Sequence, residues 1–138
     1  MKIAINGFGR IGRHALKVAW EKEGIEVVAV NDLTDNKALA HLLKHDTAYP
    51  DFSHEVGYSD DAITIDGKEI VALSKRDPAN LPWAELGVDV VLECTGVFRT
   101  KEKASLHLAA GAKKVILSAP GKGEGIKGYV RCVNGGSY

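Results

Sequence analysis

The hydrophobic residues of this chain fall alternately into short continuous runs and into stretches with helical spacing. The run at residues 2–6 is short enough for a strand, and the apolar residues that follow recur at helical spacing. We expect this first helix over about residues 10–23, ending at Gly24, because glycine readily adopts the left-handed conformation that ends helices. A second apolar run at residues 25–30 predicts the next strand.

The same alternation continues to residue 117, with one interruption. Side-chain caps at residues 34–36 predict a second helix through the apolar positions 38–43. Short strands are then expected at 55–58, 62–65 and 68–73, the last two joined by Asp66-Gly67, a typical two-residue hairpin turn. The remaining expected elements are one helical turn at 81–86 with Trp83 as a packing anchor, a strand at 88–93, a helix from Thr100 to Gly111, and strands at 114–117 and 129–133.

This order of elements is typical of one fold class. Alternating strands and helices predict an α/β fold, with a doubly wound, mostly parallel sheet and a small antiparallel insertion at about residues 55–73. The final Gly-Gly-Ser at 135–137 is typical of a linker or a terminus.

Three glycines with the spacing G-x-G-x-x-G separate the first expected strand from the first helix. Gly7 allows a sharp turn, the missing side chain of Gly9 lets a pyrophosphate approach the backbone, and Gly12 lets the helix pack closely on the strand. The unpaired N–H groups and the dipole at the start of a helix favour anionic groups. The pattern therefore predicts a phosphate-binding turn.

An acidic residue follows the second expected strand at the position that a dinucleotide site requires. Asp32 lies twenty positions after Gly12, where a carboxylate accepts hydrogen bonds from the adenosine ribose. The alternative is a glycine turn plus a solvated aspartate. Since Asp32 is followed by Leu33 and no arginine is at hand to neutralise the 2′-phosphate of NADP, we expect NAD to bind at least about tenfold more tightly, about 1.4 kcal/mol.

Composition restricts the class of protein. The 138 residues, 45% of them hydrophobic, suit a single domain, and 18 basic side chains balance 18 acidic ones. This interspersed charge favours neither nucleic acid nor membrane surfaces as partners. No apolar run approaches the roughly 20 residues that span a bilayer, and no signal peptide is evident, so we expect a soluble cytoplasmic protein.

The cysteines and histidines predict neither a metal site nor thiol catalysis. Cys94 and Cys132 are too few for a disulfide scaffold, and a lone cysteine usually behaves as a small apolar residue. His41 and His45 lie one helical turn apart but lack a third ligand. The remaining histidines are expected on solvated faces: His14, His54 and His107.

Several motifs together resemble the amino-terminal domain of phosphorylating glyceraldehyde-3-phosphate dehydrogenase. In chain order they are N-G-F-G-R-I-G-R at 6–13, V-N-D-L-T-D at 30–35, R-D-P at 76–78, E-C-T-G-V-F at 93–98, G-A-K-K-V-I at 111–116 and S-A-P at 118–120. The resemblance covers residues 1 to about 134. It implies a Rossmann domain that binds NAD at 1–134, followed by a linker-like tail at 135–138.

The resemblance also implies a role for individual residues. It places Asp32 on the adenine ribose, Arg76 near the adenine, and Ser118 toward the nicotinamide. Thr95 and Gly96 are implied to line the cofactor. The residues implied at the pyrophosphate are Gly7, Gly9, Arg10, Ile11 and Gly12.

Parts of the family pattern have no counterpart in this sequence. The Ser-x-x-Cys-Thr-Thr nucleophile motif, the catalytic histidine and the carboxyl-terminal helix are absent, and the segment 121–136 departs from the usual pattern. The resemblance therefore implies no catalytic residue and no metal ligand here, and we expect the catalytic domain to be absent. Apolar surface left without these parts is expected to favour self-association.

Three functions remain open from the sequence. In the first, the chain is the NAD-binding half of a glyceraldehyde-3-phosphate dehydrogenase and is expected to bind NAD but not to catalyse alone. In the second, it is an isolated or engineered Rossmann binding module without activity. In the third, it is the same domain of an erythrose-4-phosphate dehydrogenase.

Overall fold

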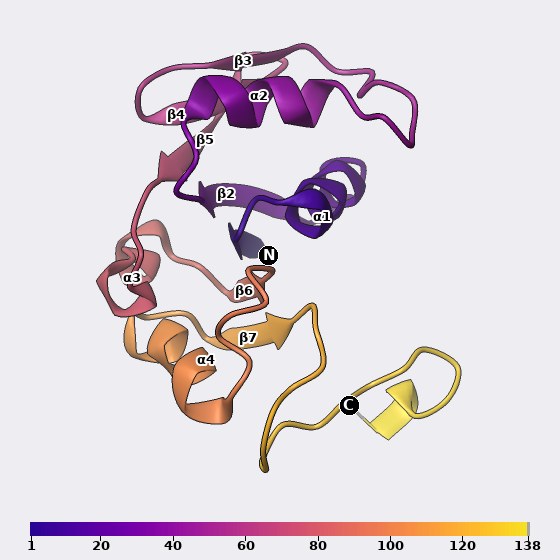
Figure 1. The fold of residues 1–138 in the computed structure, drawn as a ribbon, viewed down its shortest axis with the longest axis vertical. Coiled ribbons are helices and arrows are strands. Elements are labelled where there is room, and N and C mark those ends of the chain that lie inside the picture. The colour runs from indigo at the N-terminus through magenta and orange to yellow at the C-terminus, as the bar shows by residue number, and fades with distance from the viewer. Residues whose placement is uncertain (138) are drawn as a thin grey trace.

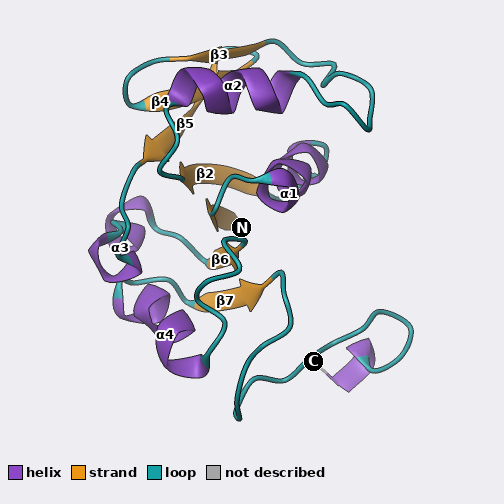
Figure 2. Ribbon diagram, viewed as in Figure 1, coloured by secondary structure: helices purple, strands orange, loops and turns teal. Residues whose placement is uncertain are grey.

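A computed structural model describes residues 1–137, which form one seven-stranded sheet with helices on both faces (Figure 1, Figure 2). The strand order is β3-β4-β5-β2-β1-β6-β7. The strands are β1 Lys2–Asn6, β2 Glu26–Asn31, β3 Val56–Tyr58, β4 Ala62–Ile65, β5 Lys68–Leu73, β6 Val90–Glu93 and β7 Lys114–Leu117. The helices are α1 Arg10–Trp20, α2 Asn36–Lys44, α3 Trp83–Leu86 and α4 Lys101–Ala109, with 3-10 turns η1 at Pro78–Asn80 and η2 at Gly135–Ser137.

The sheet combines a parallel part with an antiparallel edge. Strands β5, β2, β1, β6 and β7 run parallel, whereas β4 pairs antiparallel with β3 on one side and with β5 on the other. The predicted α/β class, with an antiparallel insertion, is confirmed. Because the parallel strands share a direction, their carboxyl ends meet at one edge of the sheet.

Each face of the sheet has its own hydrophobic core. Ile3 and Ile5 of β1 pack with Leu16 of α1 and with the buried residues of α2 and β4. Ala4, between them in sequence, points to the opposite face and belongs to a second cluster around Trp83 of α3, which is fully buried. Burial on both faces explains why the central strands are continuously apolar, and the anchor role predicted for Trp83 is confirmed.

Local signals placed several element boundaries correctly. Asp35 caps α2 by accepting a hydrogen bond from Ala38 N at 2.9 Å, and Thr100 caps α4 by accepting one from Lys103 N at 3.4 Å. Asp66 and Gly67 both have positive φ, 49° and 78°, as a type I′ hairpin turn requires. Helix α1 ends at Trp20, earlier than expected, and the chain turns through Gly24.

The strand expected at 129–133 is wrong. The segment instead forms an exposed turn in which the carbonyl of Val130 accepts hydrogen bonds from the backbone N–H groups of Val133, Asn134 and Gly135. A strand needs a neighbouring strand for its backbone groups, and here a local turn satisfies them. Residues 135–137 form the turn η2, so the expected linker has local structure, and Tyr138 lies outside the described residues. This carboxyl-terminal segment extends away from the sheet (Figure 1).

Candidate functional site

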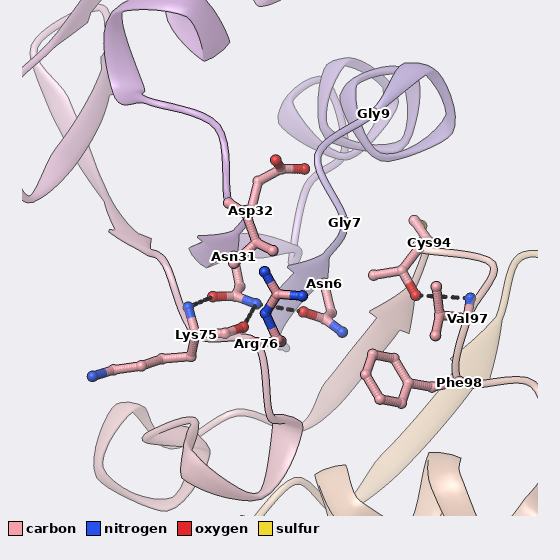
Figure 3. Close-up of a pocket in the computed structure, with 12 residues that line it drawn as sticks. Asn6, Gly7, Gly9, Asn31, Asp32, Lys75, Arg76, Cys94, Val97 and Phe98 are labelled. Carbon is pink, nitrogen blue, oxygen red and sulfur yellow. Dashed lines mark hydrogen bonds between the residues drawn. The ribbon is translucent and has the colours of Figure 1, made fainter.

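The loops that follow β1, β2, β5 and β6 enclose a cavity of about 400 Å³ at the carboxyl edge of the sheet (Figure 3). Asn31 and Lys75 lie on one side of it, and Cys94, Val97 and Phe98 lie on the other. An open α/β sheet binds its ligands at such an edge. The residues that line the cavity are Asn6, Gly7, Gly9, Asn31, Asp32, Leu33, Lys75, Arg76, Cys94, Thr95, Val97 and Phe98.

The three glycines of the first loop differ in what surrounds them. A Cβ on Gly7, whose φ is +90°, would lie 2.6 Å from the backbone N of Thr95, and a Cβ on Gly12 would lie 2.2 Å from the carbonyl oxygen of Gly7. A Cβ on Gly9 would meet no protein atom within 4 Å. Gly7 and Gly12 therefore serve the packing of the fold, whereas Gly9 leaves open space at the cavity.

Helix α1 begins beside this open space. Its N-cap is Gly9, and no side chain caps the helix. The first-turn N–H groups therefore remain available to an anion at the start of the helix, where the dipole also favours negative charge.

Asp32 joins two of the loops that enclose the cavity. Its Oδ2 accepts a hydrogen bond from Phe8 N at 2.8 Å, and its Oδ1 accepts one from Thr34 N at 3.0 Å. An ionised carboxylate has about four acceptor positions, so each oxygen retains the capacity to accept one more hydrogen bond. The side chain can thus bind a pair of hydroxyl groups while holding the glycine loop.

The remaining predicted site residues divide into two groups. The structure brings Arg76 and Thr95 into the cavity with Gly7, Gly9 and Asp32. Gly96 adjoins Thr95 with φ +72°. Four predicted residues do not line the cavity: Arg10, Ile11, Gly12 and Ser118. Arg10 and Ile11 lie in the first turn of α1, where Ile11 is 55% exposed, and Gly12 lies behind the loop. Ser118 lines a separate groove between β7 and residues 126–129.

The expectation that no arginine is at hand to neutralise a 2′-phosphate beside Asp32 is wrong. Leu33 follows Asp32 in the sequence, but the fold places Arg76 and Lys75 in the same cavity. They come from the loop after β5, which lies beside β2 in the sheet. Any discrimination against the 2′-phosphate of NADP therefore depends on the negative charge of Asp32 and not on a lack of cations.

Residues 1–101 match the family described as glyceraldehyde 3-phosphate dehydrogenase, NAD binding domain. The chain belongs to this family. The glyceraldehyde-3-phosphate dehydrogenase of Thermotoga maritima is 55% identical over 95% of this chain and 40% of its own length. Those of Clostridium pasteurianum and Mycoplasma pneumoniae are 55% and 52% identical over 96% and 97% of this chain, again 40% of their own length. The chain spans about two fifths of these curated relatives, and NAD, the cofactor of the family, is the one that the sequence predicted.

Beneath the cavity, the NAD-binding domain contains a network of buried polar side chains that sequence reasoning missed. Asn6, Asn31 and Glu93 end β1, β2 and β6, and Asn6 is the register partner of both others. All three are buried, as is His107 of α4. The sequence does contain a signal for this network, because three apolar strands that are neighbours in a doubly wound sheet each end in a polar residue.

One end of the network is fixed by the backbone of Lys75. Its N–H donates to Asn31 Oδ1 at 2.8 Å, and its carbonyl accepts from Asn31 Nδ2 at 2.8 Å, which sets the orientation of that amide. Asn31 Nδ2 also donates to Asn6 Oδ1 at 2.7 Å. The amide of Asn6 must therefore point its Nδ2 toward Glu93, to whose Oε2 it donates at 2.6 Å.

The other end is fixed by the indole of Trp83. Indole nitrogen is a donor only, so the 3.0 Å contact from Trp83 Nε1 makes Nδ1 of His107 an acceptor without a proton. The imidazole is then the neutral tautomer that carries its proton on Nε2 and donates to Glu93 Oε2 at 3.0 Å. The expectation that His107 lies on a solvated face is wrong, because this histidine orients a buried carboxylate.

Glu93 is consequently surrounded by donors. Besides Asn6 and His107, the backbone N–H of Thr95 donates to Oε1 at 2.8 Å, and the hydroxyl of Thr95 donates to the same oxygen. Burial by itself raises the pKa of Glu93, but the hydrogen bonds from His107, Thr95 and Asn6 outweigh it and hold the pKa below its ordinary value. The carboxylate is therefore ionised, and it fixes the loop after β6 that lines the cavity.

Cys94, which also lines the cavity, does not have the properties of a nucleophile. Burial raises the pKa of its thiol, a hydrogen bond with Ser118 partly offsets this, and the charge of Glu93 raises it further. Within residues 1–137, no group of three or more His, Cys, Asp or Glu side chains is arranged to hold a metal ion. Across the same residues, no helix has the length and apolar character needed to cross a membrane.

Proposed function

We propose that this chain binds NAD in the cavity at the carboxyl edge of its sheet, as the amino-terminal domain of a glyceraldehyde-3-phosphate dehydrogenase. The main support is the open space at Gly9, which the fold itself does not require and which lies at the uncapped start of α1. In this proposal Gly7, Gly9, Arg10, Ile11 and Gly12 hold the pyrophosphate through the loop and the first helical turn.

The nucleosides are assigned to the residues on either side of this loop. Asp32 accepts hydrogen bonds from the adenine ribose, and Arg76 lies beside the adenine. Thr95 and Gly96 line the cofactor after β6, and Ser118 lies toward the nicotinamide. When bound, NAD supplies an acceptor for a hydride, and the residues of this chain bind and orient it.

The complete reaction of such an enzyme converts an aldehyde to an acyl phosphate in glycolysis, in the cytoplasm. We propose that this chain alone does not catalyse it, since the pKa of Cys94, the one cysteine in the cavity, is raised and its thiolate correspondingly disfavoured. Adding NAD, aldehyde and phosphate to the purified chain is expected to give no NADH. Steady formation of NADH would refute this part of the proposal.

The decisive measurement is a calorimetric titration of the purified chain with NAD. We expect binding in the micromolar range, and an Asp32→Ala variant is expected to bind NAD more weakly because the ribose loses its acceptor and the glycine loop loses the Phe8 N contact. An Asp35→Ala variant is a matched control, since Asp35 caps α2 and does not line the cavity. No binding by the wild-type chain would refute the proposed function.

The same titration with NADP tests cofactor choice. The carboxylate of Asp32 repels a 2′-phosphate, so we expect NADP to bind at least about tenfold more weakly, about 1.4 kcal/mol. Asp32→Ala is expected to reduce this difference, because Arg76 and Lys75 then line the cavity without an opposing acid. Equal affinities for NAD and NADP in the wild-type chain would contradict the reasoning.

We also propose that residues 1–134 act as one domain with 135–138 as its tail.

A further part of the proposal is that copies of the chain associate through the edge of the sheet. Strand β7 ends the sheet order, and Ile116 within it is 45% exposed. An apolar edge strand is a ready template for pairing with another chain. Sedimentation velocity is expected to show association that an Ile116→Lys variant weakens, and a monomer at high concentration would refute it.

A further inference from the structure

The cavity has two unequal sides, and the strand order determines which half of a dinucleotide lies on each. Strand β2 lies on one side of β1 and β6 on the other, so the loop after β1 sits between them. Asp32 follows β2 and takes the adenosine ribose in the proposed function. The nicotinamide half of the dinucleotide therefore lies on the side of β6, where the strand ends in Glu93.

Glu93 supports the wall of the cavity on this side directly. Its Oε1 accepts hydrogen bonds from the backbone N–H and the hydroxyl of Thr95, and the hydroxyl oxygen of Thr95 accepts one from Val97 N at 3.1 Å. Thr95 and Val97 both line the cavity. The carboxylate is thus separated from the cavity by a single residue.

In the described part of the chain, no lysine or arginine forms a hydrogen bond or ion pair with the carboxylate of Glu93. Its hydrogen-bond partners among residues 1–137 are a neutral amide, a hydroxyl, a backbone N–H and the His107 imidazole, which the donor at Trp83 keeps neutral. The side chain is 1% exposed. A charge buried in this way acts through a medium of low effective dielectric constant and is screened little by salt.

We propose that Glu93 is a specificity-determining residue that favours the oxidised dinucleotide, whose nicotinamide ring is cationic, over the reduced dinucleotide, whose ring is neutral. This inference rests on the proposed function, because it requires NAD in the cavity. The hydrogen bonds of Glu93 to Thr95 hold the wall in place for either form, whereas its charge distinguishes between the two.

The test is the ratio of the dissociation constants for NADH and NAD⁺, measured by titration of the full chain. Glu93→Gln removes the charge and is expected to lower the preference for NAD⁺ by about fivefold or more, an effect that persists at high salt. The ratio of these two dissociation constants, measured on one variant, is unaffected by a smaller folded fraction or a looser loop, because these weaken the binding of NAD⁺ and NADH alike. The matched control is Glu102→Gln on the exposed first turn of α4, for which we expect an unchanged ratio.

A second pair of variants separates charge from position. Thr95→Val keeps the charge and removes one hydrogen bond to Glu93, so it is expected to weaken NAD⁺ and NADH equally. If Glu93→Gln alone does not fold, the change is made together with Trp83→Phe, which lets His107 exchange its tautomer and accept from the new amide. That double variant is compared with Trp83→Phe alone.

The possible results lead to different conclusions. An unchanged ratio in the Glu93→Gln chain, or a Glu93 carboxyl that carbon NMR of the wild-type chain shows to be protonated at neutral pH, would overturn the inference while leaving the proposed function intact. A wild-type chain that binds neither dinucleotide would overturn both.

Discussion

Replacing Gly12 and Gly9 separately by alanine distinguishes a glycine that the fold needs from one that a ligand needs. At Gly12 the new methyl group would lie 2.2 Å from the carbonyl oxygen of Gly7 and 3.1 Å from Cγ2 of Ile5. The carbonyl belongs to the backbone of the glycine loop, so it cannot rotate away as a flexible side chain would. Either α1 or the loop must shift to relieve the contact.

The two changes should differ clearly in stability. Overpacking of this kind costs about 1–3 kcal/mol, and the better helix propensity of alanine returns up to about 1 kcal/mol. With a backbone atom as the obstacle, we expect Gly12→Ala to lower the free energy of unfolding by about 2 kcal/mol. Gly9→Ala meets no atom within 4 Å and has an ordinary φ of −71°, so only the loss of a favoured N-cap residue applies, about 0.5 kcal/mol.

The affinity for NAD should follow a different order. The methyl group of Gly9→Ala occupies the open space that the proposed pyrophosphate site requires, so we expect NAD to bind at least about tenfold more weakly, about 1.4 kcal/mol, to a chain of nearly normal stability. Urea unfolding followed by circular dichroism gives the stability, and calorimetry gives the affinity. Gly136→Ala is the matched control, because its added methyl group also meets nothing within 4 Å and Gly136 lines neither the cavity nor the groove that contains Ser118.

Two outcomes would refute this reasoning. A Gly12→Ala chain as stable as the wild type would show that the loop relaxes at little cost, contrary to the packing argument. A Gly9→Ala chain that binds NAD normally would show that the open space beside α1 is not where the phosphates lie.

Two further predictions concern titrating and reactive groups. His54 contacts Glu21 and Asp66 at 2.6 Å each, and these hydrogen bonds raise its pKa above the ordinary 6.5. The stabilisation is therefore complete below about pH 6.5 and lost as the pH rises through the raised pKa; unfolding measured against pH should show this decline, and His54→Gln should abolish it. Of the two free cysteines, the exposed Cys132 should react with iodoacetamide faster than Cys94, whose pKa is raised. Mass spectrometry should show that NAD slows the reaction of Cys94 only, and equal protection of both would contradict the position of the cavity.

The sequence predicted those parts of the structure that depend on neighbouring residues. The hairpin turn at Asp66-Gly67 and the caps at Asp35 and Thr100 each need only a few adjacent residues, and all are confirmed. The glycine spacing and Asp32 identified two of the loops around the cavity, because parallel strands bring their carboxyl ends together.

The features that the sequence did not predict depend on residues far apart in the chain. The residues next to His107 in the sequence give little indication that it is buried, and its partners Trp83 and Glu93 come from other elements. Lys75 reaches the cavity because β5 pairs with β2 and not with the strand that follows it in sequence. The strand expected at 129–133 failed for a related reason, since a strand depends on a neighbour that no local pattern supplies.

The polar network beneath the cavity also restricts how this sequence can change over evolutionary time. The donor-to-acceptor direction of its hydrogen bonds is fixed at one end by the backbone of Lys75 and at the other by the indole of Trp83. Exchanging a donor for an acceptor at Asn6, Asn31 or Glu93 therefore places two donors or two acceptors opposite each other. A buried mismatch of this kind costs about 1–3 kcal/mol. Single steps away from the present arrangement are therefore unfavourable, and a viable alternative requires coordinated replacement on three strands.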